Sequence, residues 1–163
     1  MSNTRTVQVT TPGDRDIVVT REFDAPRRLV FDAWTKPELL VRWLDARGRK
    51  LDVRELDLRV GGRFHFVWHG EGKKDVGVRG TYREIVDGER LVHVENWTDW
   101  DTGETTVTTE FVERNGRTTM TATMRYPSRD VRDAVLKSGM EGGAGESYEN
   151  LDRLLAALAA SAI

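Results

Sequence analysis

The chain has 163 residues, contains no cysteine, and carries 25 basic and 27 acidic residues for a formal charge of −2. A nearly neutral chain has no overall field to attract nucleic acid or an anionic membrane, and a chain without cysteine has no disulfide and no thiol nucleophile. The first residues lack the apolar run of a signal peptide or membrane span, so we expect a single cytoplasmic domain over residues 1–163.

The N-terminal part of the chain predicts one strand followed by two short helices. Residues 1–14 are rich in Thr, Ser, Gly and Pro without any period, and we expect a loose tail there. The first strand is expected over residues 17–23. Pro26 is tolerated in the first turn of a helix, and Thr35 and Glu38 have the spacing of a capping box that would start a second helix.

From residue 51 onward, apolar residues alternate with a period of two, which predicts a β-meander. A change of phase near Glu55 indicates a β-bulge. Asp87-Gly88 and Asn115-Gly116 predict two-residue hairpins, because type I′ turns need positive φ at both central residues. A softer turn is expected at residues 101–103. The strands are expected at residues 51–58, 63–69, 76–86, 90–97, 104–113 and 117–126.

The last third of the chain predicts one long helix from Ser128 to Leu158. Ser128 is a suitable N-cap, and apolar residues recur at the 3.6-residue period of a helix face. Glycines at 139, 142, 143 and 145 each weaken a helix by roughly 1 kcal/mol relative to alanine. We expect a continuous, kinked helix through Gly142 to Gly145, with its small side chains facing the sheet. Strands followed by a helix indicate an α+β architecture.

Several polar motifs have ordinary structural interpretations. His65 and His69 lie on a strand with their α-carbons roughly 13 Å apart, too far to share one ion, so we expect surface histidines and no metal site. Residues 70–74 lack the full spacing of a phosphate-binding loop, which favours a hairpin connection. Basic residues interleaved with acids indicate a solvated surface rather than a nucleic-acid interface; they are Arg27, Arg28, Arg42, Arg47, Arg49 and Lys50.

His93 and Glu95 are the most informative polar pair. Regular alternation places them on one face of a strand with Leu91 and Trp97. If that face is interior, the imidazole and the carboxylate can bind or protonate a ligand; if Val92 and Val94 face inward instead, the pair faces water. Both orientations stay open. The sequence contains neither a GxSxG nucleophile elbow nor a recognisable hydrolytic triad.

The aromatic and methionine residues fit either a solid core or a hollow one whose apolar walls bind a ligand. Composition alone leaves both alternatives open. The residues concerned are Trp43, Phe64, Phe66, Trp68, Tyr82, Trp97, Phe111, Met120, Met124, Met140 and Tyr148.

Six segments carry a resemblance to a known family and occur in the family's order along the chain. They are Arg21 to Pro26, Ala33 to Glu38, Arg42-Trp43, Asp57 to Phe64, Gly80 to Ile85 and Glu89 to Leu91. Together they resemble the bacterial SRPBCC proteins of the START-like, birch-allergen-like superfamily, and within it the homologues of the activator of the heat-shock-ninety ATPase. The resemblance runs from about residue 17 to 158. It implies a helix-grip fold, in which a curved antiparallel sheet of about six or seven strands holds a long C-terminal helix above a cavity.

The chain departs from the family pattern at three places. Leu44 and Asp45 replace a Trp and a Gly, Val60 replaces a frequent Pro, and Ala144 stands where the last helix usually carries a Trp. A missing indole at Ala144 should leave room for a ligand, for a rotated Tyr148 or Trp43, or for a partner chain.

From the resemblance we expect a binding protein for a small hydrophobic or aromatic molecule, without a cofactor. An enzyme of the cyclase or aromatase kind, with His93 and Glu95 as acid and base, is the alternative; a chaperone-binding module is the third, and a homodimer stays open. The expected ligand-binding residues are Trp43, Phe64, Phe66, Trp68, Tyr82, His93, Glu95, Trp97, Phe111, Met120, Met124, Met140, Ala144 and Tyr148.

Overall fold

The computed structural model describes residues 6–45, 47–98, 100 and 102–161 of the chain. Its elements follow one another as β1 (Gln8–Thr10), β2 (Asp16–Phe23), α1 (Arg27–Thr35), α2 (Pro37–Trp43), β3 (Lys50–Leu56), β4 (Arg63–His69), β5 (Val76–Val86), β6 (Arg90–Trp97), β7 (Thr105–Arg114), β8 (Arg117–Arg125), α3 (Arg129–Lys137) and α4 (Met140–Ser161).

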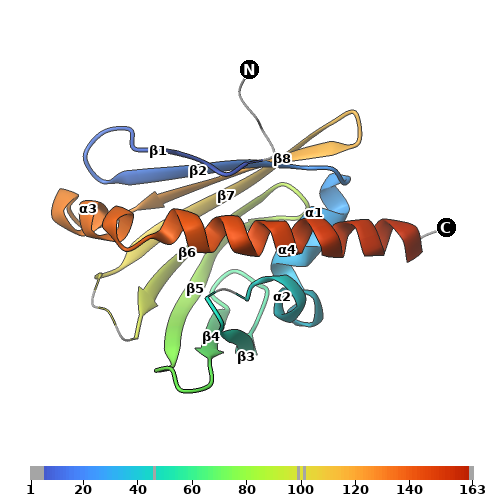
Figure 1. Ribbon diagram of the computed structural model, residues 1–163. Helices are drawn as coiled ribbons and strands as arrows, with labels where there is room; N and C mark the ends of the chain where they lie inside the picture. The colour runs from blue at the N-terminus through green and yellow to red at the C-terminus, as the bar shows by residue number, and fades with distance from the viewer. Residues whose placement is uncertain (1–5, 46, 99, 101, 162–163) are drawn as a thin grey trace.

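The strands form one antiparallel sheet of eight strands in the order β1-β2-β8-β7-β6-β5-β4-β3. Strand β2 pairs with β8 along its whole length, from Asp16 opposite Arg125 to Phe23 opposite Thr118. In Figure 1, α4 crosses one face of the curved sheet, and α1 and α2 lie near the C-terminal half of α4. This is the α+β, helix-grip arrangement that the resemblance implied. None of the described helices has both the length and the apolar character needed to span a bilayer.

The sheet has eight strands instead of the six or seven expected, because residues 8–10 form an edge strand within the segment expected to be a loose tail. Val9 lies opposite Val19 in an antiparallel pair. A three-residue strand shows no periodicity that sequence could reveal, and its hydrogen bonds to β2 are what define it. Residues 1–5 of that segment lie outside the described residues.

The turns of the sheet follow the sequence in part. The register shift between Val53 and Glu55 confirms the expected bulge. Asn115 and Gly116 both have positive φ, at 53° and 76°, as a two-residue hairpin requires. At the other expected hairpin, Asp87-Gly88, only Gly88 has a positive φ, at 77°. There Val86 pairs with Arg90, so three residues connect the strands and the predicted two-residue turn is wrong. The softer turn expected at residues 101–103 includes Asp101, which lies outside the described residues.

The starts of the two short helices also differ from the expected caps. Pro26 is the N-cap of α1 rather than a residue of its first turn, and Lys36 is the N-cap of α2 with Pro37 following it. The Thr35 hydroxyl donates to the carbonyl of Phe31 at 3.0 Å, inside α1. The predicted capping box is therefore wrong, because Thr35 is the last residue of the preceding helix.

The long C-terminal helix is divided in two. Ser128 is the N-cap of α3 as expected, accepting a hydrogen bond from the Val131 amide at 3.2 Å. Gly139 has φ of 83° and separates α3 from α4, so one continuous helix from Ser128 to Leu158 is wrong. Helix α4 does continue through Gly142 to Gly145, as predicted. The break falls where one glycine takes a left-handed conformation and not where the glycines cluster.

Candidate functional site

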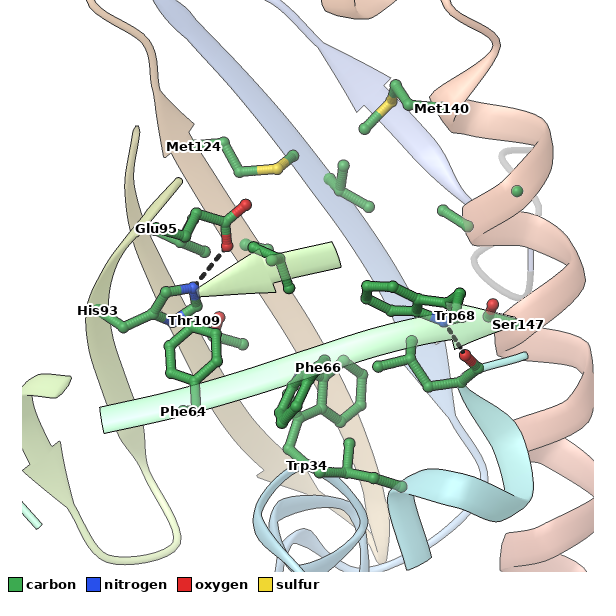
Figure 2. Close-up of a pocket in the computed structure, with 18 of the residues that line it drawn as sticks. Trp34, Phe64, Phe66, Trp68, His93, Glu95, Thr109, Met124, Met140 and Ser147 are labelled. Atoms are coloured by element: carbon green, nitrogen blue, oxygen red, sulfur yellow. Dashed lines mark hydrogen bonds and ion pairs between the residues drawn. The ribbon is translucent and has the colours of Figure 1, made fainter. Parts of the chain in front are cut away.

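A cavity of about 470 Å³ lies between the concave face of the sheet and the first half of α4 (Figure 2). Its walls come from most of the elements of the fold, because a curved sheet turns the inward side chains of its strands toward a common space. The residues that line it are Val19, Trp34, Leu40, Trp43, Leu44, Arg47, Arg49, Phe64, Phe66, Trp68, Val76, Val78, Tyr82, Leu91, His93, Glu95, Trp97, Val107, Thr109, Ala122, Met124, Met140, Gly143, Ala144, Ser147 and Tyr148.

Most of the residues expected from the sequence meet at this cavity. The expected residues that line it are Trp43, Phe64, Phe66, Trp68, Tyr82, His93, Glu95, Trp97, Met124, Met140, Ala144 and Tyr148. The core is thus hollow at one end, which composition could not decide.

Phe111 and Met120 do not line the cavity. They are fully buried and lie opposite each other on β7 and β8. The ring of Phe111 packs edge-on against Phe31 and Trp34, at centroid distances of 5.6 and 5.4 Å. Helix α1 therefore fills the other end of the sheet, and these two side chains belong to the solid part of the core.

Strand alternation could have identified several of the residues that we missed. Val76 and Val78 share the phase of Tyr82 on β5, and Val107 and Thr109 share a phase on β7. Other missed residues come from segments without such a signal, since helix packing and loop path decide their positions. These are Trp34, Leu40, Leu44, Arg47, Arg49, Gly143 and Ser147.

Strand β6 carries the polar pair into the cavity. His93 and Glu95 line it together with Leu91 and Trp97. Of the two orientations that the sequence left open, the pair therefore has the one that faces the interior. His93 Nε2 lies 2.7 Å from Glu95 Oε1, and Trp97 Nε1 donates to Glu95 Oε2 at 2.9 Å. Because a carboxylate only accepts, Nε2 of His93 carries the proton of this bond. Glu95 is thereby fixed by one donor on each oxygen.

Aromatic rings beside this pair are held in place by hydrogen bonds. The indoles of Trp68 and Trp97 stack with a centroid distance of 5.6 Å and an interplanar angle of 20°. Trp68 Nε1 donates to the carbonyl of Leu44 at 2.7 Å. Phe64 packs edge-on against His93 at 5.0 Å. The polar edges of both indoles are thus satisfied by protein groups, which leaves their apolar surfaces for the cavity.

Helix α4 forms the wall opposite β6. Gly143 and Ala144 line the cavity where the family pattern suggests an indole, and Tyr148 lies one turn further along. The ring of Tyr148 stacks on Trp43, with centroids 6.2 Å apart and an interplanar angle of 30°. Ser147 donates to the carbonyl of Asp45 at 3.1 Å, which joins α4 to the loop after α2. Small residues thus widen the cavity just beyond a well-packed aromatic cluster.

The open end of the cavity carries the arginines. Arg47 is exposed and Arg49 half-exposed, whereas Trp43 and Tyr82, further in, are buried. Arg47 donates to the main-chain carbonyls of Ser138 and Gly139 at the end of α3, and Arg49 Nε donates to the carbonyl of Lys74 at 3.2 Å. Both guanidinium groups therefore link this rim to neighbouring segments.

Burial shifts the acid strength of two tyrosines at the cavity. It raises the pKa of Tyr82 to about 12, and it also raises the pKa of Tyr148, where the nearby Arg21 acts in the opposite direction. Both phenols are therefore neutral at physiological pH. The hydroxyl of Tyr82 can donate or accept a hydrogen bond within the cavity.

Neither the other histidines nor residues 70–74 are among the residues that line the cavity, although residues 73 and 74 contact the arginines at its open end. His69 contacts Asp75 at 2.9 Å and Asp52 at 3.3 Å on the outer face, and hydrogen bonds to these carboxylates raise its pKa. Burial lowers the pKa of His65. Residues 70–74 connect the paired strands β4 and β5, as the hairpin interpretation predicted. Among the described residues, no group of three or more His, Asp or Glu side chains is placed to hold a metal ion.

Comparison with known proteins agrees with this architecture. A family model described as Activator of Hsp90 ATPase homolog 1-like protein matches residues 24–156. The chain belongs to this family. The match covers α1 to α3, strands β3 to β8 and most of α4, so every cavity-lining residue except Val19 of β2 falls within the Activator of Hsp90 ATPase homolog 1-like region. Among curated protein sequences, none matches the chain.

Several solved structures share the fold. A protein from Rhodobacter sphaeroides is 31% identical, with a TM-score of 0.88 over 93% of this chain and 99% of that one. A protein from Nitrosomonas europaea is 25% identical, with a TM-score of 0.80 over 92% and 99%. A protein from Arthrobacter aurescens is 22% identical, with a TM-score of 0.83 over 91% of both chains, and shows the fold alone.

Proposed function

We propose that this protein binds a small hydrophobic or aromatic molecule in the cavity between the sheet and α4. The observation that carries the proposal is the cavity itself, whose volume of about 470 Å³ is within the range of small-molecule sites. Its walls are mainly aromatic and aliphatic, with few polar groups. Removing a ligand's apolar surface from water at such walls gains about 25 cal/mol per Å².

Preformed walls favour binding because little has to be ordered when the ligand enters. Hydrogen bonds to the carbonyl of Leu44 and to Glu95 hold Trp68 and Trp97, and packing on Trp43 holds Tyr148. Side chains already fixed lose less conformational entropy on binding, so more of the burial energy appears as affinity.

The test is to fill the cavity from α4. Ala144→Trp places an indole in it, and we expect loss of binding of an uncharged hydrophobic fluorescent probe, N-phenyl-1-naphthylamine. The matched control is Ala157→Trp on the exposed side of the same helix. Probe binding is measured by fluorescence titration, with circular dichroism to confirm that both variants fold. Equal probe affinity in both variants would contradict the proposal.

A second candidate function rests on the His93–Glu95 contact at 2.7 Å. An imidazole held by a carboxylate at the wall of an apolar cavity is a suitable acid or base for proton transfer on a bound aromatic molecule. Substrate screening with the purified protein tests it. Turnover that is unchanged in His93→Ala would exclude that role for the imidazole.

A further inference from the structure

We infer that the ligand presents a hydrogen-bond donor, an amine or a hydroxyl group, to Glu95 at the inner wall of the cavity. This inference rests on the proposed function, since it concerns the chemical class of the molecule that fills the same cavity. It predicts that an apolar ligand carrying a donor binds more tightly than a fully apolar ligand or an aromatic acid.

Glu95 is well placed to select the ligand. Its side chain is 16% exposed, and among the described residues it is the sole carboxylate that lines the cavity. In Figure 2 it points from β6 into the cavity, between His93 and Met124. Burying a charged group in such apolar surroundings costs free energy unless the group has hydrogen-bond or ion-pair partners.

The protein satisfies this carboxylate only in part. Oε1 accepts from His93 and Oε2 accepts from Trp97, at 2.7 and 2.9 Å. A carboxylate has about four acceptor positions, so each oxygen retains one. A ligand that displaces water from these positions without offering a donor loses affinity. We expect that loss to be about tenfold or more.

The neighbouring groups do not compensate for a ligand without a donor. The hydroxyls of Tyr82 and Thr109 can donate or accept, so they do not discriminate between ligand groups. His93 directs its Nε2 proton at Glu95 and is not free to hold a ligand anion through that atom. A ligand carboxylate at this wall would also be repelled by Glu95.

The aromatic walls suit a planar ligand body carrying such a donor. Trp68 and Trp97 present a stacked pair of ring systems, and Trp97 is bonded directly to Glu95. Flat molecules gain from offset or edge contacts with such rings. A protonated amine would gain a further cation–π attraction, which distinguishes amines from hydroxyl compounds.

The experiment compares four matched probes by isothermal titration calorimetry: naphthalene, naphthol, naphthylmethylamine and naphthoic acid. We expect naphthol and naphthylmethylamine to bind about tenfold tighter than naphthalene, and naphthoic acid to bind most weakly. In Glu95→Gln, which keeps the shape but replaces one acceptor by a donor, we expect that preference to shrink to within about threefold. Glu110→Gln, on the outer face of β7, is the matched control and should keep the wild-type ranking.

Each outcome decides a separate point. A wild-type protein that binds none of the four probes would overturn the proposed function. Binding of all four with equal affinity, or tightest binding of naphthoic acid, would overturn this inference alone, the latter by favouring the arginines at the open end. If Glu95→Gln does not fold, the wild-type ranking of the four probes decides by itself.

Discussion

At the scale of single residues, Arg21 shows how a buried charge positions α4. It projects from β2, is 4% exposed, and pairs with Asp152 of α4 through two bonds of 2.8 and 2.6 Å. Its guanidinium also lies over the ring of Phe23, 4.8 Å from the centroid. A bidentate ion pair fixes both the distance between helix and sheet and the relative orientation of the two side chains. Arg21 thereby fixes α4 over the closed end of the core.

Asp152→Ala should destabilise the protein by roughly 2 to 3 kcal/mol, because it leaves the charge of Arg21 buried without a countercharge. Urea denaturation measures the change. The control is Asp57→Ala, which removes an exposed pair with Arg59 and should cost less than about 1 kcal/mol. Equal effects for both substitutions would show that solvent compensates Arg21.

At the scale of elements, the division between α3 and α4 depends on Gly139. Its φ of 83° lies in the left-handed region, where a residue with a Cβ is strained, and an added Cβ would lie 2.8 Å from Nη2 of Arg47. Gly142 is helical, and an added Cβ there would meet no atom within 4 Å. Glycines three positions apart therefore have opposite roles.

Substituting each of the two glycines with alanine should change stability in opposite directions. Gly139→Ala should destabilise by about 1 to 2 kcal/mol because it strains the backbone between the helices. Gly142→Ala should stabilise by about 0.5 to 1 kcal/mol because alanine loses less conformational freedom in a helix. Midpoints of urea unfolding curves measure both. Stabilisation by Gly139→Ala would mean that α3 and α4 can merge into one helix.

At the scale of the whole molecule, one curved sheet provides a solid core at one end and a hollow one at the other. Helix α1 covers the closed end, where Phe111 and Met120 are fully buried. The cavity occupies the remainder, beneath the small residues of α4. Tyr148, between the two, packs on both Phe23 and Trp43. Binding is therefore expected to require little change in the packed end.

All three tyrosines of the chain report on the integrity of this core. Burial raises the pKa of each, to about 12 for Tyr82, and the charge of Glu95 adds to the effect at Tyr126. Above about pH 10 the unfolded chain releases phenolic protons that the folded chain retains, so stability falls as pH rises. Below that pH this contribution is fully present.

Denaturation curves from neutral pH to about pH 11 should show this loss, at up to about 1.4 kcal/mol per pH unit for each tyrosine. Tyr82→Phe should reduce the slope, because it removes one of the titrating groups. Phenolate absorbance that develops near the pKa of free tyrosine, while the protein remains folded, would show that the phenols are accessible to water.

The sequence by itself determined the elements whose signals are local. Alternation located the strands from β4 to β8, and Ser128 and Asn115-Gly116 marked a helix start and a hairpin. The resemblance of segments between Arg21 and Leu91 indicated the fold. These features depend on backbone conformation and on the periodicity of neighbouring residues, so nearby sequence is sufficient to predict them.

Only the tertiary structure decided how the sheet and helices divide their common space. It placed Phe111 and Met120 in the solid core, although their side chains resemble those of the cavity wall. It also turned His93 and Glu95 inward and divided the last helix at Gly139. Each outcome depends on which distant element packs against a residue, and sequence spacing contains no direct record of those contacts.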